Sequence, residues 1–314
     1  MADACQSSSC ASKGKTCGSP DAAKSQQDLA ITRSLSMIRY KILVMSGKGG
    51  VGKSTVATNL ALGLANRGHK VGLMDVDLHG PDICRMLNLT DSLQSSPPKG
   101  GGQIPPMRYN DKLSVISLEY LMADRDDPII WRGPLKVAAI RQFIADIAWG
   151  ELDYLIIDAP PGTGDEPLTV AQLIKDAQAI VVTTPQEVAL ADVRKSINFC
   201  RHVKMHILGV VENMSGFVCP HCQETVEIFK AGGGQKTASA FGLTLLGKIP
   251  MDPKVVIGGD AGTPYLSSQA DSPAVVAFQG VVAQVEAAVA QKKITLDPAL
   301  GARGSACDPK ACSR

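Results

Sequence analysis

The chain has 314 residues, 45% of them hydrophobic and 20% charged, an ordinary globular composition for one large domain or two small ones. Its 32 Lys and Arg residues nearly balance 30 Asp and Glu residues, and the formal net charge of +2 gives no sign of a nucleic-acid partner or an anionic membrane partner. No apolar run approaches the roughly 18 to 20 residues that span a bilayer, and the N-terminus is polar, so we predict a cytoplasmic protein.

The chain is predicted to contain one folded domain, over residues 34 to 292, between two flexible tails, residues 1 to 33 and 293 to 314. The first tail is rich in small and polar residues and the second has no helical periodicity, so neither buries enough apolar surface to offset its ordering entropy. Five of the nine cysteines lie in the tails: Cys5, Cys10, Cys17, Cys307 and Cys312. Because disulfides seldom persist in the cytosol, metal or redox chemistry is the expected use of some of these thiols.

From Tyr40 onward, short apolar runs bounded by Gly, Asp and Pro alternate with longer segments of helical period. This pattern is typical of parallel strands joined by helices, so we predict an α/β fold with a doubly wound, mainly parallel sheet flanked by helices. The predicted strands are Lys41 to Met45, Val71 to Asp75, Leu113 to Leu118, Tyr154 to Asp158, Ala179 to Thr183, Ile207 to Glu212 and Leu243 to Ile249. The predicted helices are Lys53 to Asn66, Pro134 to Trp149, Pro167 to Lys175, Ala189 to Val203 and Ser272 to Gln291. The Pro- and Gly-rich segment 95 to 106 is predicted to be a mobile surface loop.

A glycine-rich sequence lies between the first predicted strand and the first predicted helix. Residues 47 to 54 read GKGGVGKS and fit the P-loop pattern G-x-x-x-x-G-K-[ST], in the strand-to-helix context that its mechanism requires. Backbone N–H groups of such a loop bind phosphates, its lysine reaches the β- and γ-phosphates, and its hydroxyl ligates Mg2+. We therefore predict that Mg-ATP is bound, with Ser54 on the metal, by Gly47, Lys48, Gly49, Gly50, Val51, Gly52, Lys53, Ser54 and Thr55.

A second lysine, Lys48, lies at the start of this loop. The sequence GKGGVGKST resembles the deviant Walker A class of ATPases, which includes MinD, ParA and the nitrogenase iron protein and whose extra lysine reaches the partner subunit's nucleotide. By this resemblance Lys48 and Lys53 are candidate catalytic residues, Lys48 acting in trans as an arginine finger does, and dimerisation controls hydrolysis. A solvated surface lysine is the alternative interpretation of Lys48.

Acidic residues follow two of the predicted strands. Asp75, Asp77 and Asp82 lie in DVDLHGPD after the second strand, and Asp158 ends the apolar run of DYLIIDAPPGTGDE. Carboxylates at such strand ends hold Mg2+ or orient the attacking water. We assign Asp158 to the metal shell and leave the water-orienting role open between Asp77 and Asp82. Asp75 can simply end its strand.

Two further residues are predicted to contact the nucleotide. Gly162 in APPGTGD is placed to meet the γ-phosphate through its backbone N–H, as switch segments do, unless it is a plain turn glycine. Asn213 in VVENMSG and the segment Ile249 to Asp252 follow late strands, at the edge where open α/β sheets bind ligands. Asn213 is the candidate for base recognition, with a turn-forming asparagine as the alternative.

Cys219 and Cys222 form a C-x-x-C motif in a predicted loop. Two thiolates at this spacing chelate one metal centre, yet a 4Fe-4S cluster and a structural zinc each normally need four ligands. A homodimer whose axis passes beside the loop would bring two such motifs together and complete the site. Iron-sulfur and zinc both remain open at this point because thiolates suit both metals.

The chain resembles the Mrp/ApbC family of iron-sulfur cluster carrier and scaffold ATPases over residues 37 to 290. The motifs that carry the resemblance are GKGGVGKST, DVDLHGPDI, DAPPGTGDE, TTPQEVALADVRKSI and VVENMSGFVCPHC. The resemblance implies a homodimer that holds a labile 4Fe-4S cluster on Cys219 and Cys222 of both subunits. It also implies that the cluster is transferred to apo iron-sulfur proteins, and that other cluster-assembly factors are partners.

The N-terminal tail is similar to that of a eukaryotic cytosolic scaffold branch of this family, with one departure. That branch carries a second cluster on an N-terminal cysteine motif, whereas Cys5, Cys10 and Cys17 lack a fourth ligand and a C-x-x-C spacing. Tail thiols that scavenge metal or oxidise are the alternative. Cys84 and Cys200 fall in or beside predicted helices and are expected to be small core residues.

Three other functions fit part of the sequence. A positioning ATPase of the MinD or ParA type would need a membrane- or DNA-binding element, yet the predicted helix Ser272 to Gln291 is Ala- and Val-rich with lysines only after its end. An ATPase with a structural zinc at the C-x-x-C fits the thiol spacing equally. A small-molecule kinase would need an acceptor site, and none is evident in the sequence.

Overall fold

A computed structural model of the chain describes residues 20–77, 80–89, 103–117, 133–219, 221–222, 224–268 and 272–295. The five tail cysteines, Cys5, Cys10, Cys17, Cys307 and Cys312, lie outside the described residues, as does most of the predicted surface loop. Residues 103 to 106 of that loop are described, and there Ile104 is buried and bridges Ile147. The end of the predicted loop therefore packs on the core.

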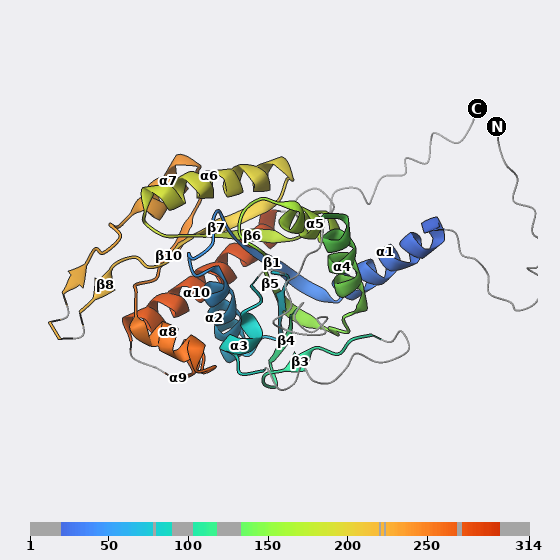
Figure 1. Ribbon diagram of the computed structural model, residues 1–314, viewed down its shortest axis with the longest axis horizontal. Coiled ribbons are helices and arrows are strands. Elements are labelled where there is room, and N and C mark those ends of the chain that lie inside the picture. Colours follow the sequence, from blue (N-terminus) through green and yellow to red (C-terminus); the bar gives the residue numbers. More distant parts are fainter. Residues whose placement is uncertain are drawn as a thin grey trace, which may run out of the picture.

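An eight-stranded sheet with the order β10-β7-β6-β1-β5-β2-β4-β3 forms the centre of the molecule (Figure 1). Neighbouring strands are parallel except for β3, which is antiparallel to β4. The strands are β1 (Ile38–Ser46), β2 (Val71–Asp75), β3 (Met107–Arg108), β4 (Leu113–Ser117), β5 (Leu152–Asp158), β6 (Gln178–Thr183), β7 (His206–Glu212) and β10 (Leu245–Lys248). The predicted doubly wound α/β fold is confirmed, and every predicted strand overlaps an observed one.

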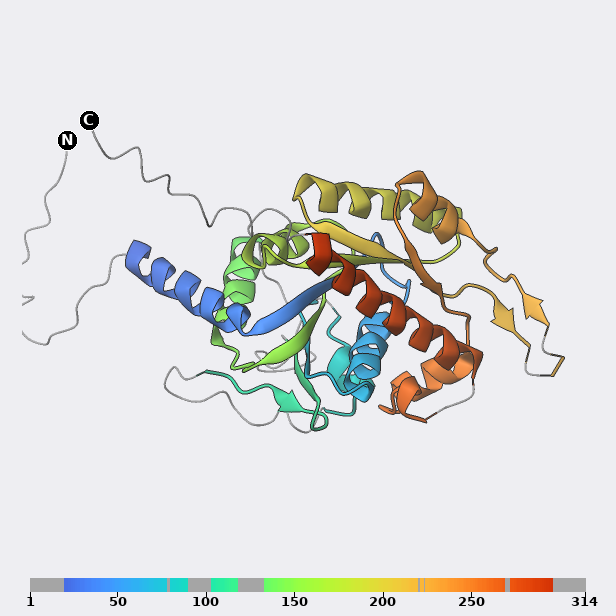
Figure 2. The same ribbon diagram turned by 180° about the vertical axis from the view of Figure 1, so that it is seen from behind.

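Helices cover both faces of the sheet (Figures 1 and 2). Successive side chains of a strand point to opposite faces, and in β1 Ile42 joins one core cluster whereas Leu43 joins the other. The first face is covered by α2 (Lys53–Asn66) and α10 (Pro273–Thr295). The second face is covered by α1 (Pro20–Ser36), α4 (Gly133–Asp146), α5 (Asp165–Leu173) and α6 (Glu187–His202). Because both faces are buried, the strands read as continuous apolar runs.

Several short elements were not predicted, because segments of this length carry too little periodicity to be recognised. They are α3 (Ile83–Met86), α7 (Gly233–Ala240), α8 (Pro253–Asp260), α9 (Tyr265–Ser268) and a separate hairpin of β8 (Phe217–Val218) and β9 (Thr225–Val226). Most of them lie near the carboxyl ends of the strands of the sheet, where a ligand site is expected.

The N-terminal helix α1 replaces part of the predicted flexible tail, since residues 20 to 33 are helical. Ile31 and Leu35 are buried and belong to the core cluster that α4 also joins, and Arg141 of α4 forms an ion pair with Asp28. The prediction failed here because the average composition of the tail hid a spacing of four residues between two apolar side chains, which places them on one helix face. The remaining parts of the two tails lie outside the described residues.

Helix α10 corrects a second expectation, that no segment has the length and apolarity of a membrane span. Within the described residues, Pro273–Gln291 meets that test by length and composition, and 39% of the window is buried inside the protein. Phe278 and Val282 pack in the core, and Glu286 bonds His69 Nε2 at 2.8 Å and ion-pairs with Arg67. The buried residues of α10 thus pack on α2 and the sheet.

We expect Leu35→Ala to lower the free energy of unfolding by about 2–3 kcal/mol, because it leaves a cavity between α1 and the core. Leu29→Ala is the matched control: Leu29 lies on the same helix but is 67% exposed, against 7% for Leu35, so its effect should stay within about 0.5 kcal/mol. Urea denaturation of the full chain measures both values. Equal effects of the two substitutions would show that α1 does not pack as described.

Candidate functional site

The P-loop connects β1 to α2 at the carboxyl end of the central strand. Gly52 precedes the first residue of α2, and Gly50 and Gly52 have φ values of 77° and 78°, a left-handed conformation that favours glycine. A Cβ added to Gly47 would lie 2.3 Å from the backbone carbon of Asp192 in α6, so α6 holds the start of the loop. The loop has the shape that the sequence pattern predicted, with the N-terminus of α2 at its end.

Lys53, the P-loop lysine, lies among three carboxylates. Its Nζ is 2.7 Å from Asp158 Oδ1 and 3.8 Å from Asp77 Oδ2, and it donates to Ser54 Oγ at 3.2 Å. Asp75 completes the group, because it pairs in register with Asp158 across β2 and β5. All four charged side chains are buried. We call Asp75, Asp77 and Asp158 the acidic triad.

Burial acts on the pKa of two members of the acidic triad. Desolvation raises the pKa of Asp75 well above its usual value, and the charge of Asp158 raises it further. Desolvation also raises the pKa of Asp158, while Lys53 and a hydrogen bond from Ser54 lower it. Two buried carboxylates beside one lysine are short of positive charge, and that is the environment in which a divalent cation is most favourable.

The structure separates the two aspartates that were proposed to orient water. Asp77 is buried beside Lys53, whereas Asp82 is exposed at the start of α3. Among the described contacts of Lys53, the carboxylates belong to Asp77 and Asp158. Asp75, for which ending its strand was one predicted alternative, accepts a hydrogen bond from the Asp77 N–H at 3.0 Å and thereby orders the turn after β2. The geometry favours Asp77 over Asp82.

Gly162 was predicted to meet the γ-phosphate through its backbone N–H. In the structure this N–H donates to the carbonyl oxygen of Ser46 at 2.8 Å, and its φ of 91° requires glycine. A contact with phosphate would need this hydrogen bond to open. The predicted role of Gly162 remains a prediction, although the bond places the glycine directly beside the P-loop.

An apolar cavity of about 280 Å³, which we call the base pocket, opens beside the P-loop. Asn213 lies in it and donates from Nδ2 to the carbonyl oxygen of Val51 at 2.9 Å. Part of its lining was predicted from the sequence, namely Gly52, Thr55 and the segment Ile249 to Asp252. The other lining residues come from separate elements and were not predicted: Met214, Phe217, Ile228, Pro253, Val255, Val256 and Phe278. A slot with apolar walls and one amide suits a planar heteroaromatic base.

The β8–β9 hairpin carries the C-x-x-C motif and extends from one end of the molecule (Figures 1 and 2). The Cys219 side chain is half-buried, Cys222 is exposed, and the Cys219 N–H donates to the Glu224 carbonyl oxygen at 2.9 Å. N–H groups of Cys222 and His221 lower the pKa of the Cys219 thiol. Within the described residues, no group of three or more metal-ligating side chains forms.

Cys84 and Cys200 are buried, as predicted, and both lie in helices. Burial raises the pKa of the Cys200 thiol to about 12. Cys200 Sγ lies 3.5 Å from Met45 Sδ in the core cluster of the second face. These two cysteines therefore act as small apolar residues.

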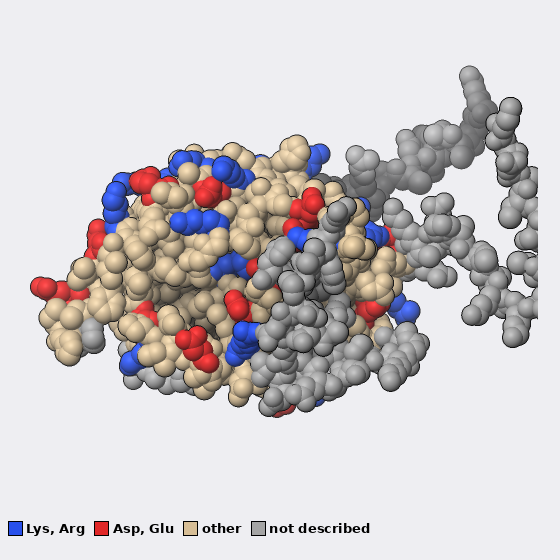
Figure 3. Space-filling view, in the orientation of Figure 1, with Lys and Arg blue, Asp and Glu red and all other residues tan. Residues whose placement is uncertain are grey.

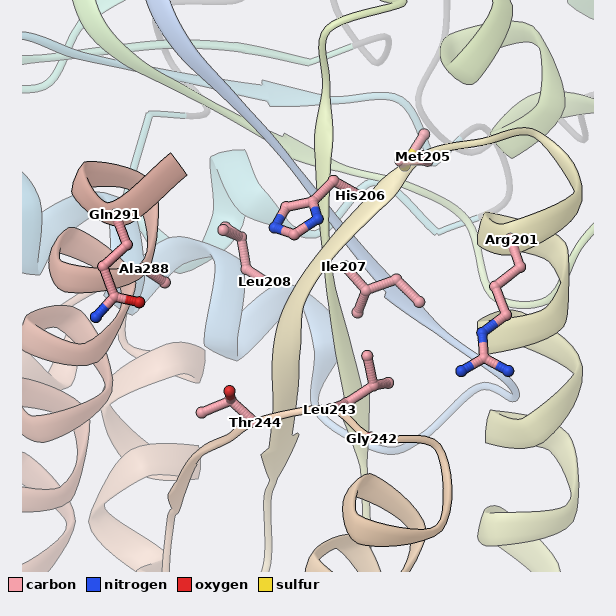
Figure 4. A pocket seen from close by; sticks show the side chains of 10 residues that line it. All are labelled: Arg201, Met205, His206, Ile207, Leu208, Gly242, Leu243, Thr244, Ala288 and Gln291. Atoms are coloured by element: carbon pink, nitrogen blue, oxygen red, sulfur yellow. The ribbon is translucent and has the colours of Figure 1, made fainter. Parts of the chain in front are cut away.

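A second hollow, of about 490 Å³, lies at the amino ends of β7 and β10, at the opposite end of the sheet from the P-loop. Figure 4 shows it between α6 and α10, with Arg201, His206 and Gln291 at its rim. It contains none of the residues predicted to form a site.

On the face seen in Figure 3, the described Lys and Arg side chains are interspersed with Asp and Glu.

Comparisons with known proteins agree with this geometry. A family model described as "ParA: NUBPL iron-transfer P-loop NTPase" matches residues 37–286. An "Iron-sulfur cluster carrier protein" of Methanocaldococcus jannaschii is 46% identical over 90% of this chain and 99% of its own length. The "Cytosolic Fe-S cluster assembly factor CFD1" of Saccharomyces cerevisiae is 50% identical over 74% of this chain and 80% of its own. A nucleotide-binding protein of Archaeoglobus fulgidus, solved in complex with ADP, superposes with a TM-score of 0.66 at 37% identity, covering 78% of this chain and 94% of that one.

We expect Gly52→Ala to destabilise the protein by about 1–3 kcal/mol, because its φ is left-handed and its Cβ would lie 2.2 Å from Asn213 Nδ2. Gly49→Ala in the same loop is the control, since a Cβ there meets nothing within 4 Å. Adding Asn213→Ala to Gly52→Ala should recover part of the loss, because it removes the clashing atom. Thermal unfolding of wild type, Gly52→Ala, Asn213→Ala and the double variant completes this double-mutant cycle, and strictly additive losses would contradict the contact.

The thiols are expected to react with iodoacetamide in a fixed order at pH 7.5. Cys219 should be alkylated readily, because a lowered pKa enlarges its thiolate fraction at neutral pH. Cys200 should stay unmodified until the protein unfolds, because its pKa is about 12 and its side chain is buried. Peptide mass spectrometry with and without urea checks this order, and early modification of Cys200 in the folded chain would contradict it.

Proposed function

Because this chain belongs to the ParA-type family of NUBPL iron-transfer P-loop NTPases, we propose that it binds and hydrolyses ATP and carries an iron-sulfur cluster to apo-proteins. The proposal rests on two features that occur together: a complete P-loop with a base pocket, and the thiols of half-buried Cys219 and exposed Cys222 on a hairpin that forms part of the wall of the same pocket. The names of the relatives, as carrier and assembly factors, support the cargo.

The nucleotide side of the proposal uses the P-loop and the acidic triad. The glycine-rich backbone and Lys53 bind the phosphates, and the base enters the apolar pocket beside Asn213. Mg2+ would be held by Ser54 and Asp158 and would neutralise charge on the β- and γ-phosphates. Asp77, rather than Asp82, orients the attacking water, because only Asp77 is buried next to Lys53.

On binding phosphate, Lys53 exchanges its ion pair with Asp158 for the nucleotide, which leaves the Asp158 carboxylate available to hold a divalent cation. Lys48 is half-buried at the start of the loop. We assign it to the partner subunit's nucleotide, where its charge stabilises the transferring phosphoryl group in trans. Hydrolysis is therefore expected to be slow in the monomer.

The cargo side of the proposal needs two chains. Each contributes Cys219 and Cys222 from an extended hairpin, and an isologous contact between two hairpins brings four thiolates together around one 4Fe-4S cluster. An exposed, shared site permits release to an apo-protein, because opening the dimer removes half of the ligands at once. We place this activity in the cytoplasm, in line with the cytosolic designation of the yeast relative.

Anaerobic reconstitution tests the cargo. Wild-type protein given iron and sulfide should become brown and hold about four irons and four sulfides per dimer. Cys219→Ala and Cys222→Ala should each lose this iron, whereas Cys84→Ala, at a buried thiol, should keep it. Purified protein that is colourless and holds stoichiometric zinc at the same two cysteines would favour a structural zinc site. A monomeric holo-protein with full iron content would also contradict the proposal.

Two lysine substitutions test the nucleotide chemistry. Lys53→Ala should abolish ATP binding, because it removes the buried phosphate ligand. Lys48→Ala should keep the affinity within about threefold but lower kcat by about 10³-fold, as loss of a charge supplied in trans does. The specific rate of wild type should rise with protein concentration. Equal activity of Lys48→Ala and wild type would reduce Lys48 to a solvated surface residue.

A further inference from the structure

Glu212, the last residue of β7, is fully buried although it carries a carboxylate. It lies at the point where the chain leaves the sheet, and the next twenty residues run out through the β8–β9 hairpin and back to α7. We call residues 213 to 232 the Cys excursion. A buried carboxylate needs partners, and those of Glu212 all belong to the two ends of the Cys excursion or directly adjoin it.

Three hydrogen bonds join Glu212 to these two ends. Oε1 accepts from Ser215 Oγ at 2.5 Å, near the outgoing end, and from the Gly232 N–H at 3.1 Å, at the returning end. Oε2 accepts from the Gly234 N–H at 2.5 Å, in the first turn of α7. One carboxylate therefore clamps both ends of the Cys excursion, and the helix N-terminus adds a favourable dipole.

The clamp adjoins the base pocket. Asn213, the next residue, lines the pocket and bonds the P-loop at Val51. Phe217 and Ile228, on the two sides of the hairpin, form part of the pocket wall. The Ser215 N–H donates to the Ile249 carbonyl oxygen at 2.8 Å, and the Met251 N–H donates to the Gly216 carbonyl oxygen at 2.7 Å. The hairpin that carries the thiols is thus one wall of the cavity proposed for the base.

From this arrangement we infer that Glu212 is a positioning residue that couples the base pocket to Cys219 and Cys222. A base in the pocket packs on Phe217 and Ile228, and because Glu212 fixes both ends of the Cys excursion, that contact moves the hairpin as a unit. Without the clamp the hairpin would respond to the base only at its wall residues. The inference rests on the proposed function for its biological meaning, but the coupling between nucleotide and thiols does not require a bound cluster.

The local chemistry requires glutamate at this position. Glutamine keeps the length but has one carbonyl oxygen, so in either orientation its N–H₂ group faces a donor that Glu212 accepts, either the Gly234 N–H or the Ser215 and Gly232 donors at Oε1. Aspartate is one methylene shorter. Gly234 is matched to the same side chain, because a Cβ there would lie 2.9 Å from Glu212 Cβ and 2.9 Å from Oε2.

Nucleotide-dependent thiol reactivity tests the coupling. Reduced, cluster-free full-length protein is pulsed with iodoacetamide, with and without saturating Mg-ADP, and the rate at Cys219 and Cys222 is followed by peptide mass spectrometry. In wild type we expect the nucleotide to change this rate by about five- to tenfold. In Glu212→Gln the nucleotide effect should fall below about twofold, while ADP affinity stays within about threefold.

Two further variants keep the test decisive. Glu286→Gln is the matched control, since it also removes a carboxylate with several partners. Glu286 lies on α10 and bonds Arg67 and His69, so this variant should keep the wild-type nucleotide effect. Ser215→Ala removes one bond of the clamp and should reduce the effect partially, so it serves if Glu212→Gln fails to fold. An unchanged effect in both clamp variants, or none in wild type, would overturn the coupling. Failure of cluster reconstitution with intact coupling would instead overturn the proposed cargo.

Discussion

The ammonium of Lys53 lies 2.7 Å from a carboxylate of Asp158, and both side chains are almost fully buried. A charge in such a place is tolerated only when it is paired, and removing one partner of a buried pair typically costs about 3–5 kcal/mol. The strand order brings the pair together, since β1 lies beside β5 and β2 lies on the far side of β5. The acidic triad, the P-loop and the start of α2 are all arranged around this contact.

The same contact explains how an ATP-binding site can be stable before ATP arrives. Lys53 is held in place by Asp158, and burial together with the charge of Asp158 raises the pKa of Asp75, since one ammonium group does not balance the carboxylates around it. Phosphates paired with Lys53 and a cation paired with the carboxylates of the triad would neutralise both charges at once. Preorganisation of this kind reduces the cost of binding, because few side chains need to be ordered.

The thiol site follows a different principle. The Cys excursion leaves the sheet after β7 and has little core of its own, so its position depends on Glu212, on the Met251–Gly216 and Ser215–Ile249 bonds and on the pocket wall. A segment held by a few hydrogen bonds moves more readily than a strand buried on both faces. A carrier that must both hold and release its cargo needs such a segment. The base pocket lies directly against the Cys excursion.

The sequence by itself determined the parallel α/β sheet, the P-loop with Lys48 and Lys53, and the C-x-x-C pair, because periodicity and motif spacing are local properties of the chain. Only the tertiary structure placed Asp77 beside Lys53 and left Asp82 exposed, aligned Asp75 with Asp158 and formed the apolar cavity from Phe217, Ile228, Val255 and Phe278. It also showed a helix over residues 20 to 33, where a tail was expected, and the buried Glu212 carboxylate bonded to both ends of the Cys excursion. These features depend on strand order and on contacts between residues far apart in the chain, which no local pattern encodes.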